Sequence, residues 1–375
     1  MAHPVRRFTK GALIFCNIIV GICFLVSCYG YWFDPIKLWF VGFLTLGALY
    51  FLLLLVIFFF FWMLVKPPYM LITIICILLA WQPLRQLIKV RNAQSFSMTK
   101  ADNNLRVMSW NIEHFEILTH KTHPEKKLQM LSLINNYKPD VACFQEVVAG
   151  DSSTEAINYL PDLKQSLNMP FHYYSYNPKL DFDKDHRFGI IIFSKYPLVG
   201  EKTISHKPND YNSIFQYVDL LKDKDTFRIF NLHLQSLRFS SADLAYIDEP
   251  SIDDENNFSQ SKNIVYKFKI GFLKRKKQSD FIKQEVNKSP YPVVVCGDFN
   301  DVPNSYAYHT IGKGLQNAYT EKGTGIGRTF SGIAPTLRID NIFADKRFTI
   351  EQFVRHNKKM SDHFPIIADL YYNKP

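Results

Sequence analysis

Residues 291–301 read YPVVVCGDFND, so an apolar run passes directly into a cluster of glycine, carboxylate and amide groups. The apolar run predicts a buried strand at Tyr291–Cys296, and the polar cluster predicts a turn at its end. Strand ends that point the same way form the floor of a cleft, where convergent polar groups mark a site. The stretch therefore predicts a β-sheet with polar side chains gathered at one edge.

Five other stretches repeat this arrangement of an apolar strand that ends in polar residues. They are Trp110-Asn111-Ile112-Glu113-His114, Phe144-Gln145-Glu146, Asn231-Leu232-His233, Arg338-Ile339-Asp340-Asn341 and Ser361-Asp362-His363. Each carboxylate alone would more often be a cap or turn residue than a ligand. Six such strand ends in one part of the chain indicate a shared chemical site.

Short apolar runs and helical segments alternate irregularly from Leu105 onward. The strand candidates are Leu105–Trp110, Val141–Phe144, Gly189–Phe193, Phe227–Leu234, Tyr291–Cys296, Arg338–Phe343 and Pro365–Leu370. Helices are expected over Pro124–Tyr137 and in the second half of Lys262–Val286, and an exposed loop is expected over Ser240–Ser261. Strands that follow one another as well as helices favour an α/β sandwich over a doubly wound sheet.

The first part of the chain contains three apolar segments, Gly11–Phe33, Leu38–Val65 and Tyr69–Leu84. A membrane span takes about 20 apolar residues, so the first two segments qualify and the third is borderline. Three transmembrane helices are expected, with two spans plus an interfacial segment as the alternative. The chain then divides into a membrane region at 1–90, a linker at 91–104 and a catalytic region at 105–375.

Basic residues indicate how the membrane region is oriented. Arg6, Arg7 and Lys10 precede the first span, which predicts a cytoplasmic N-terminus and, after three spans, an extracytoplasmic catalytic region on a bacterial inner membrane. Basic residues after the third span argue for the opposite orientation, but long domains translocate largely regardless of charge. Leu25-Val26-Ser27-Cys28 resembles a lipoprotein processing box, and cleavage there would leave the catalytic region on the same side.

Most of the net charge of +10 belongs to the membrane region, which leaves about +3 from residue 95 onward. Nucleic acid therefore receives only weak support as a partner, because a nuclease that binds several phosphates usually has a basic surface. The basic stretch Lys267–Lys277 has two interpretations, a solvated helix face or a surface that attracts phosphate or lipid headgroups.

The motifs WNIE (Trp110–Glu113), QE (Gln145–Glu146), SKYPL (Ser194–Leu198), NLH (Asn231–His233), GDFND (Gly297–Asp301), RIDNI (Arg338–Ile342) and SDHFPI (Ser361–Ile366) occur in this order. With them, Leu105–Leu370 resembles the endonuclease/exonuclease/phosphatase superfamily. The resemblance implies a four-layer α/β sandwich of two packed mixed β-sheets flanked by helices. It also implies hydrolysis of a phosphoester by direct in-line attack of water.

The resemblance implies a metal site made by Glu146, Asn111 and Glu113, although several relatives carry a different residue at the position of Glu113. Carboxylates and amides without a cysteine cluster suit hard cations, so Mg²⁺ is expected, with Mn²⁺ or Ca²⁺ as alternatives. His114 and His186 are expected to be loop residues rather than ligands.

The resemblance also implies a catalytic group of six residues, His233, Asp298, Asn300, Asp340, Asp362 and His363. Asp298 would orient or deprotonate the attacking water, and Asn300 would hydrogen-bond the pentavalent phosphate. Both histidines would contact phosphate oxygens, with Asp362 holding His363 in its tautomer and orientation. Asp340 would support His363 or the metal.

A membrane-anchored, metal-dependent phosphoester hydrolase is therefore the leading prediction, acting on nucleic acid or on a phospholipid headgroup. The competing hypothesis is a catalytically inactive membrane-bound binding or scaffold module on the same fold, in which one or more chemical residues should have been lost. The lipid bilayer is the only other partner expected, and no protein partner is predicted.

Overall fold

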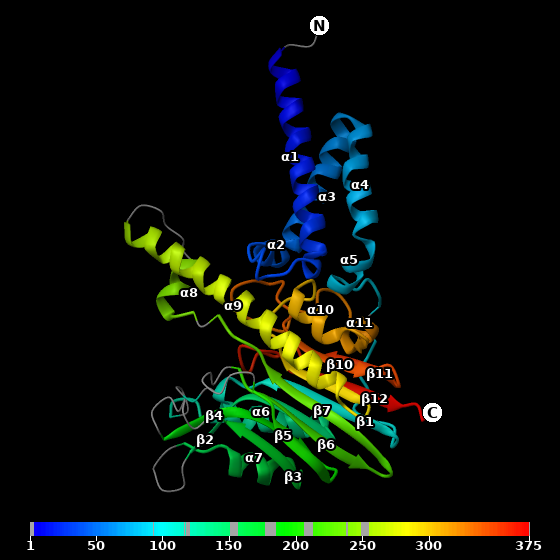
Figure 1. Ribbon diagram of the computed structural model, residues 1–375, viewed down its shortest axis with the longest axis vertical. Helices are drawn as coiled ribbons and strands as arrows, with labels where there is room; N and C mark the ends of the chain where they lie inside the picture. The colour runs from blue at the N-terminus through cyan, green and yellow to red at the C-terminus, as the bar shows by residue number, and fades with distance from the viewer. Residues whose placement is uncertain are drawn as a thin grey trace.

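The computed structural model describes residues 4–92, 94–115, 117, 121–150, 157–176, 185–205, 213–237, 239–248 and 255–374. Apolar helices form a head at one end, and two β-sheets with their covering helices form the remainder (Figure 1). The head comprises α1 (Pro4–Cys28), α2 (Val41–Leu46), α3 (Ala48–Val65), α4 (Met70–Leu79) and α5 (Trp81–Leu87), with short 3-10 turns at Gly30–Trp32 and Pro67–Tyr69.

The long helices of the head pack as a small bundle. Phe24 of α1, Leu55 of α3 and Cys76 of α4 share one buried cluster, and the Thr73 hydroxyl donates to the Leu55 carbonyl at 3.1 Å. α3 runs away from the sheets, and α4 and α5 bring the chain back toward them (Figure 1). Among the described residues, α1 and α3 are long and apolar enough to span a membrane, whereas Pro67–Leu79 and Trp81–Leu87 are bent by 70°.

The remaining chain builds two six-stranded sheets, and the predicted sandwich of two mixed sheets is confirmed. The first has the order β11-β12-β1-β2-β4-β3 and the second the order β5-β6-β7-β8-β10-β9. Within them, β1 (Asn104–Asn111) runs parallel to β2 (Val141–Gly150), and β7 (Asp225–His233) runs parallel to β8 (Val293–Asp298); the other pairs are antiparallel. The other strands are β3 (Phe171–Tyr176), β4 (His186–Ser194), β5 (Leu198–Thr203), β6 (Phe215–Lys222), β9 (Leu315–Asn317), β10 (Asp340–Asp345), β11 (Phe348–Arg355) and β12 (Ile366–Tyr372).

Three buried clusters define four layers. Val107, Cys143 and Ile192 of the first sheet pack between the sheets against strands of the second. The helices α6 (Glu125–Tyr137) and α7 (Leu160–Leu167) cover the outer face of the first sheet. The helices α9 (Glu255–Asn287) and α10 (Tyr306–Gly312) cover the second, and the short α11 (Ala318–Lys322) follows β9. Both sheets thus have a buried inner and a covered outer face.

The expectation of a loop over Ser240–Ser261 is wrong where this stretch is described. Helix α8 occupies Ser241–Asp248, and α9 is already helical at Glu255, not only in the second half of Lys262–Val286. The polar side chains that indicated a loop instead pair between the two helices. Asp243 of α8 accepts hydrogen bonds from Gln260 and Asn263 of α9 at 3.1 and 3.3 Å and forms an ion pair with Lys267.

The head is docked on the sandwich by specific polar contacts. The Asn304 side-chain amide donates to the Ser27 carbonyl at 2.6 Å and to the Thr45 carbonyl at 3.0 Å. The Arg338 guanidinium donates to the Leu87 carbonyl at 3.3 Å and to the Gln86 carbonyl.

Aromatic and main-chain contacts extend this docking. Tyr31 stacks on His309 with ring centroids 3.6 Å apart. The described residues of the stretch expected as a linker are irregular, but this stretch is also attached to the sandwich. Arg91 donates to the Thr320 carbonyl at 3.0 Å, and Lys89, just before the stretch, pairs with Gly325. These contacts therefore fix the position of the head relative to the end of the sandwich that faces it.

Candidate functional site

The end of β8 carries the first part of the site, and a glycine makes it possible. Gly297 has a φ of +139°, and a Cβ placed there would lie 2.0 Å from the Leu232 carbonyl oxygen of the neighbouring strand. Only glycine fits this close approach. The strand register then sets Asp298 beside His233 of β7 on one side and beside Asp340 of β10 on the other. Three predicted site residues thus lie in one row across the second sheet.

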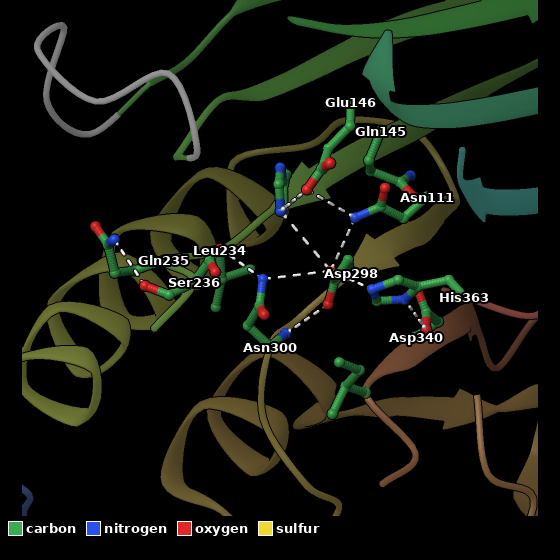
Figure 2. Close-up of polar contacts among 12 residues, drawn as sticks. Asn111, Gln145, Glu146, Leu234, Gln235, Ser236, Asp298, Asn300, Asp340 and His363 are labelled. Carbon is green, nitrogen blue, oxygen red and sulfur yellow. Dashed lines mark hydrogen bonds and ion pairs between the residues drawn. The ribbon is translucent and has the colours of Figure 1, made fainter. Parts of the chain in front are cut away.

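The first sheet contributes Asn111 and Glu146 from its two parallel strands. Asn111 ends β1 and pairs with Gln145 of β2. Glu146 has a left-handed φ of 56° where the register of β2 shifts against β4. The Asn111 amide donates to Glu146 Oε1 at 3.1 Å and to Asp298 Oδ2 at 3.3 Å (Figure 2). This side chain therefore joins the two sheets at the site.

Asp298 accepts hydrogen bonds on both carboxylate oxygens. The Asn300 backbone N–H donates to Oδ1 at 2.7 Å, and the Asn300 side-chain amide contacts Oδ2 at 3.3 Å and the Leu234 carbonyl at 3.0 Å (Figure 2). Burial, together with the nearby Asp340 carboxylate, raises the pKa of Asp298 to about 7 against the opposing influence of His363. A buried carboxylate of this kind can exchange a proton near neutral pH.

Two imidazoles face this carboxylate. His233 Nε2 lies 3.7 Å from Asp298 Oδ2 and 3.6 Å from Glu146 Oε1, and His363 Nε2 lies 3.6 Å from the same Asp298 oxygen. Burial lowers the pKa of His233. Burial would also lower the pKa of His363, but the carboxylates of Asp340, Asp298 and Asp362 together raise it well above its ordinary value.

The orientation of His363 depends on Asp340 rather than on Asp362, which corrects the role expected for Asp362. His363 Nδ1 donates to Asp340 Oδ2 at 2.8 Å, whereas Asp362 Oδ1 lies 3.9 Å from His363 Nε2. Asp340 is in turn positioned through its backbone N–H, which donates to the Thr329 hydroxyl at 3.0 Å. A carboxylate on Nδ1 fixes the tautomer and directs Nε2 toward Asp298.

Glu113 and His114 make contacts that differ from those expected for a metal ligand and for a loop residue. One oxygen of Glu113 accepts a hydrogen bond from the Asp362 backbone N–H at 2.8 Å, so it helps to position that loop. His114, expected to be only a loop residue, has Nε2 at 3.2 Å from Glu146 Oε2 and Nδ1 at 2.9 Å from the Glu146 carbonyl oxygen. Its contacts fix the side chain and backbone of Glu146 together.

A pair of buried amides beneath the site has no counterpart among the expected site residues. Gln145 Nε2 donates to Asn231 Oδ1 at 2.6 Å, and the Asn231 amide donates to the carbonyls of Phe144 and Ile191 at 3.0 and 2.9 Å. Gln145 belongs to the QE motif and Asn231 to the NLH motif, so their membership in these motifs was the sequence signal for a role at the site. The two amides tie the sheets together directly under Glu146 and His233.

A family model for the Endonuclease/Exonuclease/phosphatase family matches residues 108–363. The chain belongs to this family. Members of the endonuclease/exonuclease/phosphatase family are phosphoester hydrolases, generally dependent on a divalent metal. A second model, for a domain of unknown function (DUF8431), matches residues 10–87, which cover the head. No curated protein matches this chain significantly.

Solved structures of the endonuclease/exonuclease/phosphatase family share the fold. A family protein from Bacteroides thetaiotaomicron is 16% identical with a TM-score of 0.52, over 72% of this chain and 98% of its own. One from Bacteroides vulgatus is 17% identical with a TM-score of 0.52, over 72% and 99%. The human Nocturnin catalytic domain, solved with a bound sulfate anion, is 18% identical with a TM-score of 0.51, over 73% and 96%.

The donor set fits the divalent metal that this family implies. Asp298, Asp340 and His363 bring ligand atoms within 4.8 Å of one another, and Glu146 and Asn111 add oxygen donors beside them. Within the described part of the chain, the buried atoms His233 Nε2 and Asp340 Oδ1 have no hydrogen-bond partner. Burial would raise the pKa of Glu146, but His114, His233 and the Asn111 hydrogen bond hold it below its ordinary value. An anionic carboxylate among unsatisfied donors and acceptors suits a bound cation.

Proposed function

We propose that the chain is a membrane-anchored, divalent-metal-dependent hydrolase of phosphoesters. The observation that carries this proposal is the convergence of Glu146, Asp298 and His363 at one cleft. Asn111 of the first sheet donates hydrogen bonds to Glu146 and to Asp298 of the second. His233, Asn300 and Asp362 also line this cleft, so the expected chemical residues are retained, which argues against an inactive scaffold on the same fold.

Glu146 and Asn111 would hold the cation, with Mg²⁺ the expected ion and Mn²⁺ or Ca²⁺ alternatives. Glu113 is a weaker candidate, because one of its oxygens already accepts the Asp362 N–H. When bound, a divalent cation neutralises charge on phosphate oxygens and helps the leaving oxygen depart.

Asp298 would orient the attacking water and take its proton. The hydrogen bonds from Asn111 and Asn300 hold its carboxylate in one position, and the aligned water would attack phosphorus in line with the leaving oxygen. Asn300 would turn its side-chain amide toward the phosphate in the transition state.

His233 and His363 would donate hydrogen bonds to phosphate oxygens as negative charge develops. His363 is prepared for this by Asp340, which holds Nδ1 and leaves Nε2 directed into the cleft. Preorganised donors of this kind need no reorientation during the reaction, which is why they lower the barrier.

The head would anchor the enzyme in a bacterial inner membrane with the catalytic part outside the cytoplasm. Large apolar side chains such as Phe15, Ile22, Leu53, Ile57 and Leu78 are exposed on its outer surface, as expected for lipid-facing residues. The path of the chain supports three crossings, because α3 ends at the far end of the head and α4 with α5 returns. Protease protection in spheroplasts tests this, and a shielded catalytic part would reverse the proposed orientation.

The decisive test of the hydrolase uses the full chain in detergent with bis-p-nitrophenyl phosphate, plasmid DNA, RNA and phospholipids. Turnover of at least one substrate with Mg²⁺, lost on addition of EDTA, is expected. Asp298→Asn and His363→Ala should each reduce turnover by about 100-fold or more while the chain stays folded. The absence of metal-dependent turnover on the whole panel would contradict the proposal.

A further inference from the structure

The cleft that holds the candidate catalytic residues is lined by both polar and apolar side chains. Its volume of about 510 Å³ lies within the range of about 300–1,000 Å³ common for small-molecule sites. Part of its apolar lining is here called the apolar wall, defined as Leu46, Tyr50, Leu237, Phe239, Leu244, Phe268, Ile333 and Leu337. Hydrolysis of a small soluble phosphoester requires no such wall, so the wall indicates an apolar part of the substrate.

Two residues of the apolar wall belong to the head. Leu46 ends α2, and Tyr50, which is 45% exposed, lies in the first turn of α3. The exposed Leu53, Leu54 and Ile57 follow Tyr50 at helical spacing, so they lie on the same face of α3. An apolar stripe therefore leads from the outer surface of the head to the cleft.

The other side of the apolar wall is formed by α8 and α9. Phe268 of α9 packs against Phe43 of α2 and against Phe239, with ring centroids 5.0 and 5.5 Å apart. Next to it, Val265 and Tyr266 are exposed, and the Lys269 ammonium lies 5.3 Å from the centre of the Trp39 ring. Exposed aromatic and basic residues side by side are typical of a helix at a membrane surface.

The charges of the cleft argue against a nucleic-acid strand as its occupant. Four carboxylates line it, those of Glu146, Asp298, Asp301 and Asp362. Among the described residues that line the cleft, they face one guanidinium, that of Arg275, which is already paired with Asp301 at 3.1 Å. A strand with many phosphates requires a basic groove, whereas a single phosphate needs only the proposed cation and the two histidines.

We infer that the cleft takes an amphiphilic phosphoester from the membrane, with its phosphate beside Asp298 and His363 and its hydrocarbon chain along the apolar wall. This inference rests on the proposed hydrolase function and names its substrate class. In a phosphodiester, water adds to phosphorus and passes one proton to Asp298 while one P–O ester bond breaks. The leaving oxygen takes up a proton from solvent and Asp298 returns its proton to solvent, so the products are an alcohol and a phosphate monoester.

Two phosphodiesters with the same leaving group provide the test, ethyl p-nitrophenyl phosphate and hexadecyl p-nitrophenyl phosphate. Each is hydrolysed to the alkyl phosphate and p-nitrophenolate, so only the length of the apolar chain differs. The full chain in mixed micelles with Mg²⁺ should show a kcat/KM at least tenfold higher for the hexadecyl ester, since each methylene seated in an apolar site is worth about fourfold.

Two substitutions in the apolar wall separate binding along the wall from the presentation of the substrate in micelles. Ile333 has a left-handed φ of 53° and is 45% exposed, so Ile333→Asn removes an apolar side chain and also relieves backbone strain. Tyr50→Gln removes the aromatic ring at the head. Each should lower the hexadecyl-to-ethyl ratio of kcat/KM by roughly tenfold relative to wild type. Val199→Asn, on the edge strand β5 and also exposed, is the matched control and should leave the ratio unchanged.

The outcomes distinguish this inference from the proposed function. Metal-dependent turnover of both esters with a ratio near one, or an unchanged ratio in both wall variants, would overturn the lipid substrate and leave the hydrolase standing. Better turnover of plasmid DNA or RNA than of the hexadecyl ester would also overturn the lipid substrate and leave the hydrolase standing. No turnover of any substrate would remove the hydrolase and the inference together.

Discussion

Asp340 and Asp362 both lie near His363, but their carboxylates have different surroundings. Asp340 is buried and accepts from His363 Nδ1 at 2.8 Å, whereas Asp362 is partly exposed and lies 3.9 Å from Nε2. The sequence places Asp362 directly before the histidine, which made it the natural candidate for the orienting role. The strand register between β8 and β10 selects Asp340 instead.

This difference predicts unequal effects of two matched substitutions. Asp340→Asn should reduce kcat by about 100-fold or more, because His363 loses the carboxylate that accepts from Nδ1 and raises the pKa of the imidazole. Asp362→Asn should cost less than about tenfold, because no hydrogen bond to the imidazole is lost. Steady-state kinetics with bis-p-nitrophenyl phosphate and circular dichroism of both variants check this. A larger loss in Asp362→Asn would return the orienting role to Asp362.

Glu146 lies inside β2, and Asp340 begins β10 instead of following a strand. The positions of Asn111, His233 and Asp298 at strand ends could be inferred from the sequence, because an abrupt change from apolar to polar side chains marks them. The contact of His114 with Glu146 could not. It depends on three successive left-handed residues, Glu113, His114 and Phe115, with φ values of 46°, 52° and 51°. Their side chains give no signal for that conformation. The Gln145–Asn231 hydrogen bond depends on how two sheets pack, which no local pattern encodes.

At the scale of single elements, β1 is tied to its surroundings by a fully buried ion pair. Arg106 Nε contacts Asp369 Oδ1 of β12 at 2.7 Å, and the guanidinium also donates to the Met98 and Tyr137 carbonyls at 2.8 and 2.9 Å. One side chain thus joins β1, β12, the end of α6 and the segment before β1.

Loss of this arginine should be severe. Arg106→Ala leaves the Asp369 carboxylate buried and should lower the free energy of unfolding by about 3–5 kcal/mol. Arg347→Ala removes an exposed partner of Asp345 and should cost less than about 1 kcal/mol. Urea denaturation followed by tryptophan fluorescence compares the two. Equal urea midpoints for Arg106→Ala and Arg347→Ala would show that the buried pair of Arg106 and Asp369 is no more important for stability than the exposed pair.

The pairing of α8 with α9 should depend on pH. Burial would raise the pKa of Asp243, but hydrogen bonds from Lys267 and Ser240 lower it from 3.8 to about 2. A lowered pKa means that the folded state favours the carboxylate, so its stabilisation is complete above about pH 5 and declines as the pH falls from about 4 toward 2.

Asp243→Asn should therefore destabilise the chain by about 1–3 kcal/mol at pH 7, because Lys267 loses its anionic partner. The difference in melting temperature between wild type and variant should shrink between pH 7 and pH 3. A difference that stays constant over this range would show that the charge of Asp243 is not what holds α8.

The strands of the sheet centres were predictable, and those of the edges were not. All four edge strands, β11, β3, β5 and β9, were absent from the candidates. An edge strand has one unpaired side and many half-exposed positions, so polar residues interrupt its apolar pattern; β5, which reads LVGEKT, is an example. The interior strand β6, which reads FQYVDLLK, was missed because its apolar residues alternate with polar ones instead of forming a run.

At the scale of the whole molecule, the sequence indicated two separate regions joined by a linker, and the structure has them in contact. Phe268 and Phe272 of α9 pack against Phe43 of α2, and Asn304 and Arg338 donate to carbonyls of the head. Contacts between residues so far apart in sequence leave no trace in local composition. They join the head and the sandwich into one body.

Removal of the head should therefore harm the catalytic part. A chain that begins at residue 95 exposes Phe268 and Phe272 and should melt about 5–10 °C lower than the full chain, with increased binding of an apolar dye. Asn304→Ala in the full chain should cause a smaller shift, since it removes two hydrogen bonds and leaves the aromatic contacts intact. Identical melting and dye binding of the shortened and full chains would show that the regions are independent.

The docking of the head has a consequence for kinetics. With Asn304 and Arg338 holding the catalytic part against the ends of the helices, the mouth of the cleft would stay at one height and in one orientation above the bilayer. Such an enzyme searches a plane rather than a volume. Its rate would follow the mole fraction of substrate in its own membrane, so dilution with an inert lipid would slow it even when the total substrate concentration in the sample is unchanged.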